Sequence, residues 1–105
     1  MRELKPLSRD TVDAALAKAE RYRFLNEPGE AESICLDVLA VDAHNQSALI
    51  TLLLALTDQF GTTSDAHQRA REVLGRLDSE YDKAYYAGII AERRAKAQLA
   101  HGGAG

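Results

Sequence analysis

The sequence predicts an all-α domain of five stacked helices, and three observations lead to this fold class. Ala and Leu are abundant whereas proline occurs only at Pro6 and Pro28, a composition that favours helix. Apolar residues recur at helical spacing in five segments separated by turn signals. These segments also match one another at a shift of about 34 or 35 residues. We therefore expect an α-solenoid of antiparallel helix pairs, with two hairpins and a C-terminal capping helix.

The chain of 105 residues is long enough for one hydrophobic core and too short for two domains. We expect a flexible lead-in over residues 1–9, a single helical domain over residues 10–100 and a disordered tail over residues 101–105. The first ten residues lack the apolar region of a secretory signal, and a lone cysteine, Cys35, allows no intrachain disulfide. These features predict a cytoplasmic protein.

The first two helices are predicted over residues 10–25 and 28–41. Ser8, Asp10 or Thr11 can cap the first helix, and Pro28 suits the first position of the second. Acidic residues near the start of the second helix suit its positive end. The predicted buried residues are Val12, Ala15, Leu16, Ala19 and Tyr22 in the first helix and Ala31, Ile34, Cys35, Val38 and Leu39 in the second.

The third helix, predicted over residues 46–60, is apolar around nearly its whole circumference. Its sequence, QSALITLLLALTDQF, must be covered on most sides, and it is too short to span a membrane. Asn45 is the expected N-cap, and Gly61 is expected to end the helix in the left-handed conformation. We expect this helix to be the central layer of the stack.

The fourth and fifth helices are predicted over residues 65–77 and 80–100. Thr62, Thr63 or Ser64 can cap the fourth, and Ser79 followed by Asp82 resembles a capping box for the fifth. The second half of the fifth helix is mostly charged, as expected of a terminal helix. The predicted buried residues of the fourth helix are Ala66, Ala70, Val73, Leu74 and Leu77.

Charge and motif patterns exclude several classes of function. The net charge is -3, and no dense basic patch is present, so we expect no nucleic-acid binding. The histidines, His44, His67 and His101, form no pair at metal-binding spacing, and we place His67 on an outward helix face. Cys35 on an apolar stripe is expected to be a small buried side chain. We therefore predict no enzyme activity, no metal and no cofactor, because no phosphate loop or catalytic triad signature is present either.

The internal repeat has a unit of about 34 residues, a helix pair. Small side chains at Ala19, Ala31, Ala66 and Gly88 are expected to let neighbouring helices approach closely; the alternative for Gly88 is a merely tolerated glycine. The fifth helix can also slide by one residue, since Ala48 and Ala84 match at a shift of 36. The aligned positions of the first, third and fifth helices are Ala15, Ala19 and Tyr22; Leu49, Leu53 and Leu56; and Ala84, Gly88 and Ala91.

The length and pattern of this unit resemble the tetratricopeptide repeat over about residues 10–100. The match is carried by Ala19, Tyr22, Ala31 and the turn that follows Leu39. Three positions depart from the family pattern: Ala43 stands where proline is typical, Cys35 where a large residue is common, and Leu53 where a small residue is usual.

The resemblance implies a concave groove lined by the first helix of each repeat. Exposed aromatic, aliphatic and arginine side chains there would form an interaction hot spot, whereas in the alternative reading Phe24 and Leu54 simply pack the core. A carboxylate clamp for chaperone tails is not expected, because Leu16, Glu20 and Thr51 replace its Lys and Asn. The groove residues implied are Arg23, Phe24, Thr51, Leu54, Asp58, Tyr85, Tyr86, Ile89 and Arg93.

The leading functional prediction is a protein-interaction adaptor or scaffold that binds a peptide segment or partner protein, for instance in assembly or maturation. An alternative is a homo-oligomeric structural protein whose apolar helix faces are closed by self-association, since two and a half repeats are marginal for a solenoid. A third alternative is an enzyme or a ligand-binding bundle that uses a cavity beside the third helix. We expect no membrane partner.

Overall fold

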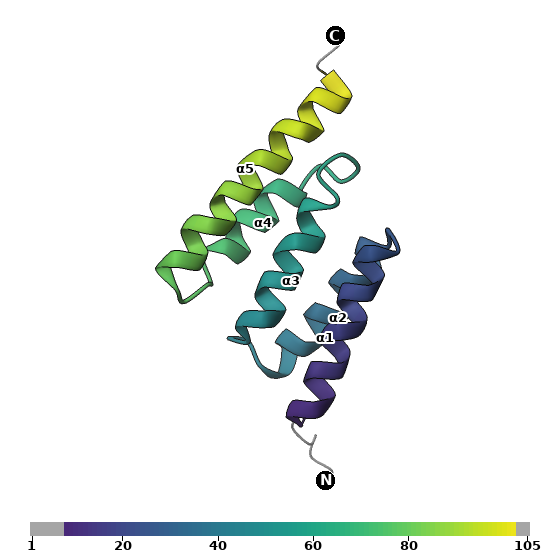
Figure 1. The fold of residues 1–105 in the computed structure, drawn as a ribbon, viewed down its shortest axis with the longest axis vertical. Coiled ribbons are helices and arrows are strands. Elements are labelled where there is room, and N and C mark those ends of the chain that lie inside the picture. Colours follow the sequence, from purple (N-terminus) through teal and green to yellow (C-terminus); the bar gives the residue numbers. More distant parts are fainter. Residues whose placement is uncertain (1–7, 103–105) are drawn as a thin grey trace.

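The computed structural model describes residues 8–102, which form five α-helices and no strand (Figure 1). The predicted all-helical fold class is therefore confirmed. Most of the expected lead-in and tail, residues 1–7 and 103–105, lies outside the described residues. The helices are α1 (Arg9–Phe24), α2 (Pro28–Val41), α3 (Gln46–Thr57), α4 (Ala66–Leu74) and α5 (Glu80–Gly102).

Local side-chain chemistry explains where α1 and α2 begin. Ser8 caps α1, because its hydroxyl oxygen accepts a hydrogen bond of 3.1 Å from the N–H of Thr11. Asn26 follows the helix in the left-handed region at φ 62°, where asparagine is better tolerated than most residues. Pro28 then starts α2 at the predicted position.

The start of α3 agrees with the prediction, but its end does not. Asn45 caps the helix by accepting a hydrogen bond of 2.9 Å from the N–H of Ala48. The helix ends at Thr57, three residues before the predicted end. Beyond it the Phe60 N–H donates to the Thr57 carbonyl, which makes a tighter turn than an α-helix. The expected role of Gly61 is wrong, because no glycine of the described residues has a positive φ.

The predicted boundaries of α4 also need correction. The helix begins at Ala66 with Asp65 at the N-cap position, and no side chain makes a cap hydrogen bond. Thr62 instead donates its hydroxyl to the Gln59 carbonyl, so this part of the turn is stabilised before α4 begins. The helix ends at Leu74, yet Leu77 beyond it is still buried, because the loop after α4 returns to the core.

The interior face of α5 differs from the one we predicted. Ser79 accepts a hydrogen bond from the Asp82 N–H at 3.1 Å, as expected of an N-cap. Gly88 is exposed, and a Cβ placed there would meet nothing within 4 Å, so the prediction of close packing at this glycine is wrong. The buried residue is Ile90, which follows the buried Leu56 by 34 residues. Burial in α5 therefore follows a repeat shift of 34 residues rather than 35 or 36.

The helices lie in two layers, with α1, α3 and α5 side by side and α2 and α4 behind them (Figure 1). Each helix packs on the next one along the chain, and α3 also contacts α1 and α5. Eight of the twelve residues of α3 are buried, including Leu49, Leu53 and Leu56, which have no exposed surface. The nearly uniform apolarity of α3 thus follows from contact with all four other helices.

Candidate partner-binding surface

The predicted groove residues all belong to the layer of α1, α3 and α5. Arg23 and Phe24 lie at the end of α1, Asp58 is the C-cap residue of α3, and the remaining positions are on α3 and α5. The three helices that carry them lie next to one another (Figure 1). We call this face of the molecule the front layer.

Three predicted groove residues meet in one ion-pair network. The Arg23 guanidinium donates to both carboxylate oxygens of Asp58, at 2.7 and 3.2 Å. Arg93 donates to Asp58 at 3.3 Å and to the hydroxyl oxygen of Thr57 at 3.2 Å. The network therefore joins α1, α3 and α5, and it has two cations for one carboxylate.

The position of Asp58 explains why one carboxylate receives both arginines. Asp58 lies at the end of α3, the middle helix of the front layer, and Arg23 and Arg93 are each 35 residues away in sequence. The two arginine side chains remain 23% and 37% exposed, so solvent screens the pairs and their contribution to stability is modest. Arg93, the more exposed and more loosely paired, can still reach a further acceptor.

The apolar groove residues differ widely in exposure. Thr51 is buried, and Leu54, Tyr86 and Ile89 are half-buried, with Leu54 and Tyr86 packed against the core. Phe24 is 90% exposed and Tyr85 is 52% exposed, so these two offer apolar surface to a partner. The core-packing alternative thus does not apply to Phe24.

Sequence reasoning missed two exposed neighbours of these side chains. Leu25 is 62% exposed beside Phe24, and Tyr81 is 75% exposed one turn before Tyr85. The rings of Tyr81 and Tyr85 are stacked with centroids 6.4 Å apart, and Tyr85 meets Tyr86 edge to face at 4.9 Å. The run of tyrosines at the start of α5 was the available signal for this cluster.

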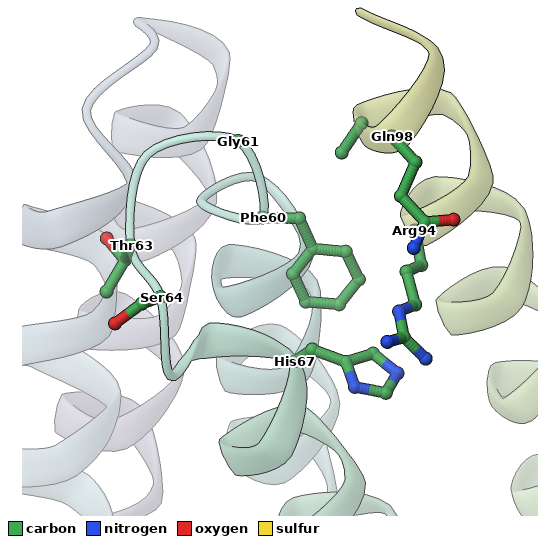
Figure 2. Close-up of a pocket in the computed structure, with 8 residues that line it drawn as sticks. Phe60, Gly61, Thr63, Ser64, His67, Arg94 and Gln98 are labelled. Carbon is green, nitrogen blue, oxygen red and sulfur yellow. The ribbon is translucent and has the colours of Figure 1, made fainter. Parts of the chain in front are cut away.

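A hollow of about 320 Å³ lies between the α3–α4 turn and α5. His67, predicted to face outward, is half-buried there with its ring edge to face with Phe60 at 5.6 Å. Figure 2 shows Arg94 extending from α5 towards His67, whereas Thr63 and Ser64 point away from this pair. Burial, and then the positive charges of Arg94 and Arg71, lower the pKa of His67. The shift favours the neutral form of the imidazole.

A second hollow, of about 250 Å³, lies on the opposite layer between α2 and α4. Leu52 and Leu56 of α3 are among its lining residues, and Arg69, Glu72 and Arg76 line it from the side of α4. Arg69 also pairs with Glu32 of α2, and Gln59 donates to the same carboxylate at 3.0 Å. These polar contacts connect α2 to α4, which do not otherwise pack together.

Residues 8–102 offer neither an exposed thiol, nor a metal-binding cluster, nor a membrane-spanning helix. Cys35 has no exposed surface, and burial raises the pKa of its thiol to about 11. Within residues 8–102, no three His, Cys, Asp or Glu side chains gather as a metal site would require. Over the same range, no helix has the length and apolar character needed to cross a bilayer.

Comparison of the chain with protein-family models, with curated proteins and with solved structures finds no match.

Proposed function

We propose that this protein is a small adaptor of the tetratricopeptide-repeat type, an α-solenoid of antiparallel helix pairs that binds a segment of another protein. The repeat of about 34 residues in the sequence supports this reading. It is further supported by Ala19, Ala31 and Ala66, the small residues of the repeat pattern, which have no exposed surface between packed helices. In this proposal the protein acts in the cytoplasm by binding and has no enzymatic activity.

The observation that carries the proposal is the combination of exposed aromatic rings on α1 and α5 with the unbalanced positive charge of the network formed by Arg23, Asp58 and Arg93. Phe24 and Tyr85 present apolar surface on α1 and α5, the two outer helices of the front layer. On the same layer, Asp58 neutralises only one of the two charges of Arg23 and Arg93. The partner segment is therefore expected to combine apolar side chains with a carboxylate that approaches Arg93, since aromatic residues and arginine dominate interaction hot spots.

Affinity capture from the native host followed by mass spectrometry would identify the partner, and a direct binding titration with its segment would test the proposal. The double variant Phe24→Ala, Tyr85→Ala should lower affinity by about 30-fold or more, as expected for hot-spot side chains. Both residues are exposed, so the variant should keep its helical circular dichroism. Tyr86 and Ile89 are less suitable because their half-burial would mix binding with packing.

The matched control removes exposed apolar side chains from the opposite layer. Leu36 and Val41 of α2 are 44% and 52% exposed, so Leu36→Ala, Val41→Ala removes a similar kind of surface. This control should bind as the unchanged protein does. The proposed groove would be wrong if the Phe24, Tyr85 variant were folded and bound the segment with unchanged affinity.

A further inference from the structure

The outer face of α5, turned away from α3 and α4, carries a continuous apolar stripe. Its buried counterpart on the opposite side of the helix includes Ile90 and the half-buried Tyr86. In Figure 1, α5 forms the edge of the front layer, with no helix beyond it. The outer stripe consists of Tyr81, Ala84, Tyr85, Gly88, Ala91, Ala95 and Leu99, which recur three or four residues apart except for the adjacent pair Ala84 and Tyr85.

No contact within the monomer explains why the side chains of the outer stripe are apolar. Tyr81 and Leu99 are 75% and 71% exposed, and single exposed apolar residues are normal, but a stripe at heptad spacing is typical of helix–helix contact. Gly88 costs about 1 kcal/mol relative to alanine inside a helix, and nothing in the monomer occupies the space beside it. A glycine at the middle of the stripe would instead allow a second helix to approach closely.

The sizes of the side chains are complementary when the stripe meets itself in the opposite direction around Gly88. Tyr81 precedes Gly88 by seven residues and Ala95 follows it by seven; Tyr85 precedes it by three and Ala91 follows it by three. In an antiparallel pair of α5 helices, each tyrosine of one copy therefore faces an alanine of the other. Two large residues fill the space left by two small ones, with the two glycines at the centre.

The charges along α5 favour the same arrangement. Glu80 and Asp82 lie in its first turn, whereas Arg94 and Lys96 lie near its other end. In an antiparallel pair centred on Gly88, Asp82 of one copy and Lys96 of the other lie on the same side of the stripe, offset by two residues, so their opposite charges can pair. A parallel pair would bring like charges together. Glu92 is the one charge on the stripe itself, and it would face the small side chain of Ala84.

We propose that a second copy of this chain covers the outer stripe, with the two α5 helices packed antiparallel around a two-fold axis at Gly88. The interface is isologous, because each pair of contacts occurs twice. This inference goes beyond the partner-binding function and does not depend on it. Tyr85 belongs to both surfaces, so a second copy on the stripe and a partner on the front layer would compete for this side chain.

Sedimentation of the full chain over a wide range of concentrations tests the proposal. The mass should rise from the monomer value of 11.5 kDa towards twice that value. Charge reversal tests the direction of packing: Asp82→Lys makes both members of the Asp82–Lys96 pair basic, and Lys96→Glu makes both acidic. Each variant alone should remain monomeric, and an equimolar mixture of the two should recover the dimer.

The central contact can be tested separately with Gly88→Leu. This change adds apolar surface and improves helix propensity, and the monomer has room for the side chain. It should nevertheless weaken the dimer, since the two helices could no longer approach closely at Gly88. A protein that stays monomeric at all concentrations would overturn the proposal. So would a dimer that persists in both single charge-reversal variants, because association would then use another face.

Discussion

At the scale of single residues, burial decides what Cys35 can do. The side chain has no exposed surface, and burial raises the pKa of its thiol to about 11, although the nearby Arg23 acts in the opposite direction. The thiolate is the reactive form of cysteine, so the thiol is inert at neutral pH. Sequence alone could predict this, because a lone cysteine at an apolar helical position has no local partner to lower its pKa.

We expect the free energy of unfolding to fall as pH rises from about 9 to about 11. The thiol of the unfolded chain ionises near its ordinary pKa of 9.0, whereas the native thiol stays protonated until about 11, so alkaline pH favours the unfolded state. With about 1.4 kcal/mol for each unit of pKa, the loss is limited to the order of 3 kcal/mol. Urea unfolding at a series of pH values measures it.

The Cys35→Ala variant is the control for this alkaline effect. It lacks the thiol but keeps every other ionisable side chain. Its stability should fall less steeply with pH than that of the unchanged protein. Equal slopes for the two proteins would show that Cys35 does not cause the effect.

The ion-pair network marks how far the candidate site could be predicted at this scale. The repeat spacing correctly brings Arg23, Asp58 and Arg93 to adjacent helices, because 35 residues separate each arginine from the aspartate. That these side chains bind one another depends on side-chain geometry between helices, which periodicity does not contain. For the same reason, the sequence did not distinguish the exposed Phe24 from the half-buried Leu54.

At the scale of helices, starts marked by a proline or by a capping side chain were easier to predict than ends. Pro28, Asn45 and Ser79 act locally, through a fixed φ or a side-chain oxygen close to a free N–H, so their sequence signals suffice. The ends of α3 and α4 depend on how the chain turns back against other helices. Thr57 and Leu74 therefore end helices that propensity alone would have continued.

The cap at Asn45 provides a direct test of this local effect. Asn45→Ala should lower the free energy of unfolding by about 1 kcal/mol, because the Ala48 N–H loses its side-chain acceptor. Ser64→Ala is the matched control: Ser64 precedes α4, is exposed and does not cap it, so the change should stay within about 0.5 kcal/mol. Chemical denaturation of both variants checks the difference. A loss at Ser64 as large as that at Asn45 would contradict this account.

At the scale of the whole molecule, the enclosed position of α3 was predictable and the orientation of α5 was not. A segment that is apolar on all sides can be satisfied only in the middle of a stack, which α3 occupies. Helix α5 is apolar on two faces, one containing Ile90 and one containing Gly88, so periodicity could not decide which face packs inward. The volume available beside α3 and α4 decides it, and bulky Ile90 fills that space.

Because α3 contacts every other helix, a substitution that leaves a cavity in α3 should destabilise the whole molecule. Leu53→Ala removes a side chain with no exposed surface, so we expect a loss of about 2–5 kcal/mol from lost burial and the cavity left behind. The matched control, Leu99→Ala, makes the same chemical change at a residue that is 71% exposed. Its effect should stay within about 0.5 kcal/mol when measured under conditions where the protein is monomeric.

The same experiment shows whether α5 unfolds together with the other helices. Circular dichroism follows all five helices, whereas tyrosine fluorescence reports mainly on α5, which carries three of the four tyrosines. Because α3 contacts every other helix, the two signals should change together at one urea concentration in the unchanged protein, and together at a lower concentration in Leu53→Ala. A tyrosine transition that clearly precedes the loss of helix would mean that α5 separates first, and that contact with α3 does not make the stack a single cooperative unit.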